Sequence, residues 1–211
     1  METLFTGIIM GFLLAAPIGP VNIETIKRGF NAGLWPAIVF GSGALLGDLF
    51  YCILLLIGLV PFLAAIPDLE RILWGGGAII MVYLGWGGIK DFWQHKEINL
   101  EEDSPKAGTG MIRGFSLGIA MAVINPYALM WYITAGGAYV STGLAKGGLL
   151  GGIASVGSFL FGVSLWLALL IFGIHKAKRL ITPTTMRIIS GVSGIALWGF
   201  AAWFALNFWG M

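Results

Sequence analysis

The chain has 211 residues, of which 58% are hydrophobic and 10% are charged, and its mean hydropathy is +0.90. Because an ordinary soluble domain is about a quarter charged, this composition excludes a soluble globular protein. The 33 glycines and 9 tryptophans are typical of helices that pack inside a bilayer. The net charge of +2 is explained better by basic residues on one side of a membrane than by binding to an anionic partner.

Apolar runs long enough to cross a membrane, about 20 residues, occur six times in chain order. The first run has no basic segment before it and exceeds the length of a signal peptide's apolar region, so we expect it to be a retained helix. A polar segment with an acidic cluster at 101–103 separates the third run from the fourth. We predict a repeat at 1–90, a cytoplasmic linker at 91–112 and a second repeat at 113–211. The expected transmembrane helices are 3–25, 35–60, 71–90, 113–137, 148–174 and 187–209.

Basic residues are distributed unevenly among the connections between these runs. Ten of the twelve Lys and Arg residues fall on one side of the expected membrane, and only Arg71 and Lys146 fall on the other. Basic loop residues are retained in the cytoplasm. The pattern therefore predicts a multi-pass protein of the inner membrane with both termini extracytoplasmic.

The two halves of the chain resemble each other. Residues 71–75 align with residues 187–191 without a gap, and proline interrupts the first helix of each half. Three spans per half is an odd number, so the second half must insert upside down. Corresponding broken helices in inverted repeats indicate a transporter whose site lies near the membrane midplane. The sequence thus predicts an all-α membrane protein of six transmembrane helices arranged as two inverted three-helix repeats.

The proline breaks are candidate substrate-binding elements. Proline removes a backbone donor, so we expect unpaired carbonyls at Ala16 and at Met121 or Ala122. Such carbonyls need a polar partner inside a membrane. Trp131 and Thr134 follow the second break on one helical face and could line a pocket with Trp131 as a substrate contact, although an aromatic stripe is more often packing or an interfacial belt. The predicted substrate-binding residues near the breaks are Pro17, Gly19, Pro20, Asn22, Asn125, Pro126 and Tyr127.

Asp48 lies about halfway along the second predicted span. Acidic residues inside a membrane are costly and usually face a cavity that serves a proton or ion pathway. We therefore predict that Asp48 binds a proton or a substrate ammonium and couples transport, and the alternative is a structural hydrogen-bond anchor. Gly43 and Gly47 precede it at a spacing that lets another helix approach closely.

Two further features have simpler explanations. Glu24 is spaced to pair with Lys27 and Arg28 on a helix, which indicates either an ordinary helix end or a gating ion pair. Cys52 is the single cysteine and lies in an apolar run, so we expect it to be packing. The sequence contains no enzyme, nucleotide or metal motif in a suitable context, and we predict no cofactor, no metal site and no nucleic-acid partner.

Five short motifs follow one another along nearly the whole chain: Ile18-Gly19-Pro20-Val21-Asn22, Ile26-Lys27 with Gly29, Gly47-Asp48, Trp74-Gly75-Gly76 and Asn125-Pro126. In this order and spacing they resemble the LysE-type translocators, which include exporters of lysine and arginine and of homoserine or threonine. The family's first-helix signature is often Pro-Gly-Pro-Asn. Here Ile18 replaces the first proline and Val21 separates Pro20 from Asn22, which is more similar to the basic-amino-acid branch. The resemblance implies six helices, dimerisation and amino-acid efflux driven by the proton gradient or membrane potential.

We therefore predict a secondary transporter, not an enzyme, that exports basic or small neutral amino acids. Alternating access would occur at a midplane site between the first and fourth helices. Its partners would be the amino acid, a proton and the lipid bilayer, and small-residue faces permit a homodimer. Three alternatives stay open: a divalent-cation exporter, for which Asp48 alone supplies few oxygen ligands, an intramembrane enzyme acting on lipid, and a membrane scaffold.

Overall fold

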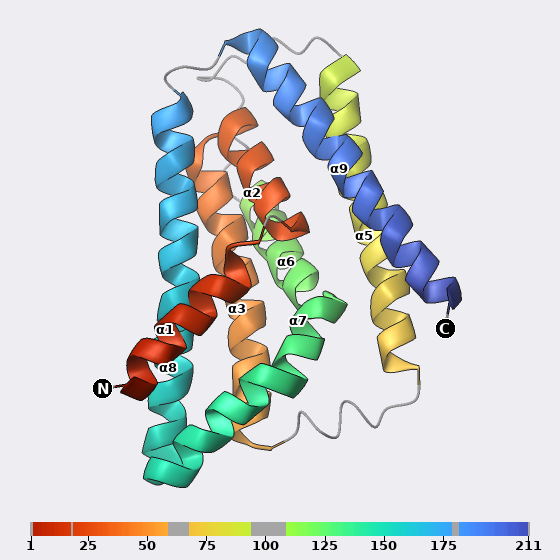
Figure 1. The fold of residues 1–211 in the computed structure, drawn as a ribbon. Helices are drawn as coiled ribbons and strands as arrows, with labels where there is room; N and C mark the ends of the chain where they lie inside the picture. The colour runs from red at the N-terminus through yellow and green to blue at the C-terminus, as the bar shows by residue number, and fades with distance from the viewer. Residues whose placement is uncertain (1, 18, 59–67, 94–108, 179–181, 211) are drawn as a thin grey trace.

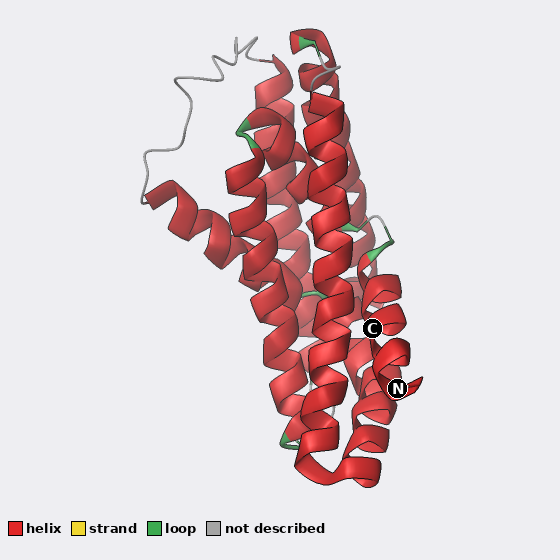
Figure 2. Ribbon diagram, turned by 90° about the vertical axis from the view of Figure 1, so that its left-hand side faces the viewer, coloured by secondary structure: helices red, strands yellow, loops and turns green. Residues whose placement is uncertain are grey.

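The protein is a helical bundle (Figure 1). The computed structural model describes residues 2–17, 19–58, 68–93, 109–178 and 182–210, and every regular element within these ranges is helical (Figure 2). The prediction of an all-α fold is confirmed for this part of the chain, whereas the acidic cluster at 101–103 lies outside it. The elements are α1 (Glu2–Ala15), α2 (Pro20–Asn31), α3 (Leu34–Leu56), α5 (Leu69–Trp93), α6 (Thr109–Val123), α7 (Pro126–Trp131), the π-helix η1 (Tyr132–Gly136), α8 (Gly137–Lys178) and α9 (Pro183–Gly210).

Four of the described helical segments are long and apolar enough to cross a membrane, namely 34–56, 71–90, 126–177 and 187–209. A fifth results if α1 and α2, which are bent by 73° at their junction, form one span. The predicted fourth span, 113–137, is not one straight helix. It is divided between α6, which is shorter than a span requires, and the segment formed by α7 and η1.

Proline divides the helices at both predicted breaks. Pro20 occupies the first turn of α2, and Pro126 occupies the first turn of α7. Proline is favoured there because the first helical residues have no intrahelical acceptor for an N–H group. Each break therefore ends one helix and starts another with a new set of free backbone N–H groups.

A turn divides α8 into two arms. Gly147 and Gly148 leave the helical conformation, and Gly148 has a φ of 57°, in the left-handed region that favours glycine. The first arm continues η1 and the second arm returns along the bundle (Figure 1). The continuous segment 126–177 is thus a bent pair, and the predicted fifth span starts at the bend.

Close helix pairs build the bundle: α1 packs on α8, α3 on α6 and α5 on α9. In the second pair, a Cβ atom at Gly43 would collide with the carbonyl oxygen of Phe115, and one at Gly118 would collide with the carbonyl oxygen of Phe40. The close approach predicted at Gly43 is confirmed.

The pair of α1 and α8 is packed in the same way, with a glycine of each helix against a backbone carbonyl of the other. A Cβ atom at Gly11 would collide with the carbonyl oxygen of Phe159, and one at Gly162 would collide with the carbonyl oxygen of Ile8. Small residues that bring backbones this close are a usual basis of helix association in membranes, where apolar side chains gain little by leaving lipid.

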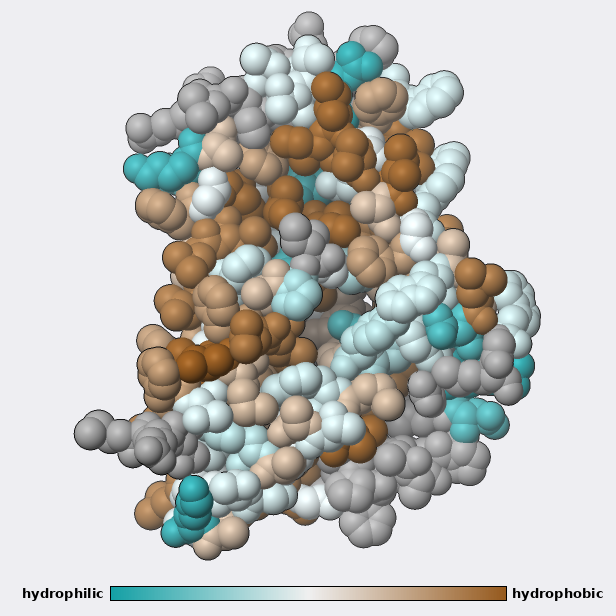
Figure 3. All heavy atoms as spheres, viewed as in Figure 1, coloured by the Kyte–Doolittle hydropathy of each residue, from teal (hydrophilic) through white to brown (hydrophobic). Residues whose placement is uncertain are grey.

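Large apolar side chains lie on the outer surface, and strongly hydrophobic residues are frequent on the face that Figure 3 shows. Phe5, Ile79, Leu150 and Trp209 are between 67% and 79% exposed, and they come from four different helices. A monomeric soluble protein rarely exposes apolar surface on this scale. The surface is therefore that of a multi-pass membrane protein whose outer side chains face lipid.

Candidate functional site

A pocket of about 750 Å³ lies between the two helix breaks, with lining residues from α1, α2, α3, α6, α7, α8 and α9. The face shown in Figure 3 is hollowed near its centre. The structure brings most of the predicted site residues to this pocket. Pro126 is the exception, because it is buried in the first turn of α7. The predicted residues that line the pocket are Pro17, Gly19, Pro20, Asn22, Asp48, Asn125 and Tyr127.

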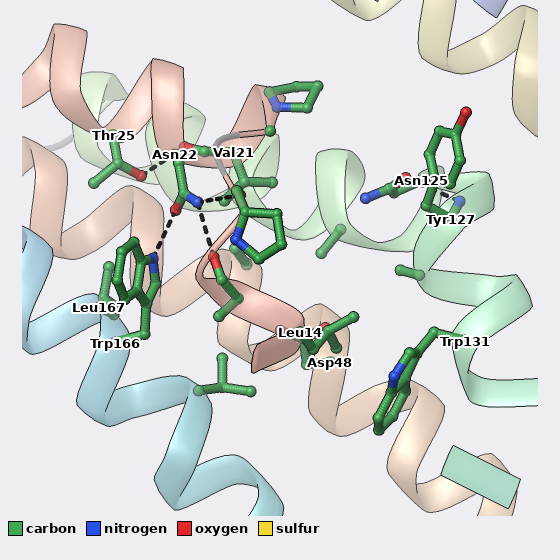
Figure 4. Close-up of a pocket in the computed structure, with 18 of the residues that line it drawn as sticks. Leu14, Val21, Asn22, Thr25, Asp48, Asn125, Tyr127, Trp131, Trp166 and Leu167 are labelled. Atoms are coloured by element: carbon green, nitrogen blue, oxygen red, sulfur yellow. Dashed lines mark hydrogen bonds between the residues drawn. The ribbon is translucent and has the colours of Figure 1, made fainter. Parts of the chain in front are cut away.

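Asn22 holds the first break in its bent shape (Figure 4). Its side-chain Nδ2 donates to the carbonyl oxygens of Ala15 and Pro17, both at 2.8 Å, and its Oδ1 accepts from Nε1 of Trp166 at 3.2 Å. The amide therefore replaces helical N–H donors that the break removes. Both of its N–H groups are used inside the protein, so its role is to position the break and Trp166.

Asn125 has a comparable role at the second break. It is the N-cap of α7, and its Oδ1 accepts from the backbone N–H of Tyr127 at 3.1 Å. This is the usual capping interaction of an asparagine. The carbonyl of Ala122, which with that of Met121 was a candidate for the unpaired group, accepts a long hydrogen bond of 3.4 Å from the backbone N–H of Asn125.

Asp48 enters the pocket from the middle of α3. Its Oδ1 accepts a hydrogen bond of 2.9 Å from the hydroxyl of Tyr132 in η1. Tyr132 is fully buried and stacks on Tyr51 at 4.9 Å between ring centroids, and Tyr51 in turn donates to the carbonyl of Val123. Two tyrosines thus link the carboxylate to the backbone beside the second break.

Aromatic side chains form much of the remaining pocket wall. Tyr127 stacks on Trp203 at 4.9 Å, and Trp131 stacks on Phe159 at 4.8 Å. Trp166 lies across the pocket from Trp131 (Figure 4). Trp131, for which the sequence left substrate contact and packing open, packs on Phe159 and also lines the pocket, and its contact with a substrate stays a prediction.

A buried ionic cluster lies beyond the pocket on α2. Glu24 is 1% exposed and pairs with Nζ of Lys27 at 2.8 Å and Nε of Arg28 at 2.9 Å. Lys27 also donates to the carbonyl of Leu84 in α5, and Arg28 lies over the ring of Phe40 in α3. The pairs expected from helical spacing are present, but the cluster is enclosed by neighbouring helices and is not an ordinary solvated helix end.

Sequence reasoning missed several lining and supporting residues. Tyr132 and Trp166 were not selected, because their polar partners Asp48 and Asn22 lie 84 and 144 residues away in the chain. Trp203 and Phe204 belong to an apolar helix without a local polar motif. Aromatic residues in the helices that flank the breaks could have indicated these positions in the sequence. The same pattern is typical of ordinary helix packing, so it does not identify a site.

Acidic residues do not gather at the pocket. Among the described lining residues Asp48 is the single carboxylate, and the described ranges contain no group of three His, Cys, Asp or Glu residues that could hold a metal ion. The polar groups of the pocket are one carboxylate, several hydroxyl and amide groups, and the backbone N–H groups at the start of α2. Gly19 is the N-cap of α2 and has no side chain that could bond these N–H groups. Such a set matches a small zwitterion better than a divalent cation.

The sequence is similar to three bacterial proteins of known description. It is 24% identical over 204 residues, covering 97% of this chain and 95% of the relative, to the "Putative amino acid efflux protein YcgF" of Bacillus subtilis. It is 23% identical over 211 residues, covering 98% of this chain and 90% of the relative, to the "Putative amino-acid transporter YisU" of the same species. Over 131 residues, or 62% of each chain, it is 28% identical to the "Chemotactic transduction protein ChpE" of Pseudomonas aeruginosa.

No solved structure matches the chain. The sequence profile of the LysE type translocators matches residues 12–207, which include both helix breaks and all the pocket-lining residues except Met10. The chain therefore belongs to the LysE type translocator family.

Proposed function

We propose that this protein is a secondary transporter that exports amino acids by alternating access at the pocket between the two helix breaks. The observation that carries the proposal is the meeting of Asp48 with two proline-started half-helices at one pocket. Broken helices at a central site are the usual construction of secondary transporters. Family membership and the descriptions of YcgF and YisU support the same class of activity.

The pocket has a place for each end of an amino acid. The substrate ammonium would pair with Asp48. The carboxylate would bind the backbone N–H groups at the start of α2, because the positive end of a helix dipole favours an anion. Gly19, Pro20 and Val21 line the pocket, so that helix end is accessible from it.

We also propose that the chain crosses the membrane six times as two inverted repeats. In this repeat, α1 of the first half corresponds to α6 of the second, α3 corresponds to the second arm of α8, and α5 corresponds to α9. The pair of α1 and α8 is then equivalent to the pair of α6 and α3. The glycine contacts support this correspondence. The step along the chain from Gly11 in α1 to Gly118 in α6 equals the step from Ile8 to Phe115. The step from Phe40 in α3 to Phe159 in α8 likewise equals the step from Gly43 to Gly162.

The pair of α5 and α9 supports the same repeat. Arg71 lies over the ring of Phe208 at 5.0 Å, and Arg187 lies over the ring of Phe92 at 5.6 Å. The step along the chain from Arg71 to Arg187 equals the step from Phe92 to Phe208. A twofold relation that runs the second half upside down accounts for both contacts at once.

The cluster of Glu24, Lys27 and Arg28 would close the cytoplasmic end of the pathway. It lies on α2 between the pocket and the helix end at Asn31, and it contacts α3 and α5. With both termini extracytoplasmic, as the distribution of basic residues predicts, this end of α2 faces the cytoplasm. The described conformation would then be closed toward the cytoplasm, and opening would separate α2 from its neighbours.

Flux through purified protein in proteoliposomes tests the proposal. The panel contains basic, neutral and acidic amino acids together with Mn²⁺ and Mg²⁺, each measured with and without an imposed pH gradient. We expect saturable, gradient-sensitive movement of at least one amino acid. Movement of the divalent cations alone would contradict the proposal and support cation export, and turnover of the lipid would support the enzyme alternative.

A further inference from the structure

The charges that line the pocket limit the charge of the substrate. Among the described lining residues Asp48 is the single acidic side chain, and none is Lys, Arg or His. A neutral amino acid presents one ammonium group, which Asp48 can pair. A second ammonium group, as in lysine, would have no carboxylate partner in the described wall, and a second carboxylate, as in glutamate, would have no cationic side chain. Leaving a charge unpaired against a largely apolar wall is costly.

The pocket wall is largely apolar and aromatic. The side-chain amide of Asn22 already makes three hydrogen bonds within the protein, so few polar groups remain for a polar substrate side chain. Aromatic rings offer large contact areas and favour stacked or edge-on aromatic partners. The aromatic lining residues come from α7, α8 and α9 and are Tyr127, Trp131, Trp166, Phe200, Trp203 and Phe204.

Buried rings outside the pocket hold this wall in place. Phe159 stacks behind Trp131, and Trp74 packs edge-on against Tyr127 at 5.3 Å and Phe204 at 4.7 Å. Neither Phe159 nor Trp74 lines the pocket, and both are buried. Packing therefore supports three of the wall's rings, those of Trp131, Tyr127 and Phe204, which lowers the cost of ordering them around a bound apolar side chain.

From these observations we infer that the exported amino acids are neutral ones with a large apolar side chain, with the aromatic amino acids preferred. This inference rests on the proposed export of amino acids. It departs from the sequence-based expectation of basic or small neutral substrates. Alanine would leave most of the aromatic wall without contact, whereas phenylalanine would cover it and remove apolar surface from water.

Transport of single amino acids in proteoliposomes tests this inference. Purified full-length protein is assayed for transport of L-phenylalanine, L-leucine, L-alanine, L-lysine and L-glutamate under one gradient. We expect L-phenylalanine to exceed L-alanine and L-lysine in kcat/KM by roughly tenfold or more, since a missing methylene alone changes discrimination by about tenfold or more in an apolar pocket. Equal or better transport of L-alanine or L-lysine would overturn the inference and leave amino-acid export standing. Transport of no amino acid would overturn both.

Variants at Trp131 show whether the aromatic wall causes the preference. Trp131→Leu should reduce the ratio of L-phenylalanine to L-alanine transport several-fold, and Trp131→Phe, which keeps a ring, should retain most of it. The matched control is Trp209→Leu, because Trp209 is 75% exposed and lies outside the pocket. A ratio that stays unchanged in Trp131→Leu contradicts the assignment of the wall.

Discussion

Asp48 is held by groups that are distant in the chain. Tyr132 donates to the carboxylate from the π-helix, and Tyr51 supports Tyr132 by stacking one turn further along α3. π-Helical turns often occur at functional sites. The orientation of the carboxylate therefore depends on the helical irregularity that follows the second break.

Replacing Tyr132 with Phe should lower the transport rate by about tenfold, because a hydrogen bond to a charged group contributes about 1.5–3 kcal/mol. The ring stays, so packing against Tyr51 and the yield of folded protein should change little. Initial rates in proteoliposomes measure the effect. Tyr139→Phe is the control, since Tyr139 bonds Ser158 outside the pocket; equal losses in both variants would contradict a specific role of Tyr132.

Glu24 should be important for stability. Removing its charge in Glu24→Gln leaves the buried Lys27 and the half-buried Arg28 without their carboxylate, and breaking a buried pair such as Glu24 and Lys27 costs about 3 kcal/mol or more. We expect a clear fall in Tm of the detergent-purified protein. The exposed Asp68→Asn serves as the control. If Glu24→Gln melts at the wild-type temperature, the cluster does not contribute as described.

At the scale of elements, the helix pairs depend on backbone contact at glycine. In Gly43→Ala the new methyl group would meet the carbonyl oxygen of Phe115, which belongs to the backbone of α6 and cannot rotate away. We expect a loss of about 1–3 kcal/mol, measured as a lower Tm. Gly199→Ala, which places its methyl group in open space, should leave Tm unchanged. An equal effect of the two changes would contradict close packing at Gly43.

Whether a helix could be predicted from the sequence depends on whether its ends have a local sequence signal. Prolines and apolar runs identified both breaks and the helices α3, α5 and α9, because these signals are local. The continuation of η1 into α8 was missed, since a helix that crosses Gly136 and Gly137 and then turns at Gly147 has no distinct local pattern.

At the scale of the whole molecule, the distribution of basic residues predicts sidedness that labelling can check. In a Cys52→Ala background, a cysteine at Lys146 should react with a membrane-impermeant maleimide in intact cells. A cysteine at Lys90 should react only after the cells are permeabilised. The reverse pattern would contradict extracytoplasmic termini.

Much of the site was also predictable, but its supports were not. Asp48, Asn22 and Asn125 stand out in the sequence because polar residues are rare in its apolar runs. The partners that orient them, Tyr132 and Trp166, depend on tertiary packing across the two halves. The inverted repeat and the homodimer remain predictions, of which the first has the paired contacts of glycine and arginine in its favour.

The central claim is that Asp48 couples amino-acid export at the pocket, and gradient-driven flux tests it most directly. Wild-type protein, Asp48→Asn and the exposed-acid control Asp68→Asn are compared in proteoliposomes under an imposed pH gradient, with equal amounts of folded protein. The account predicts that gradient-driven flux is lost in Asp48→Asn and retained in Asp68→Asn. Wild-type, gradient-driven flux in Asp48→Asn would contradict it.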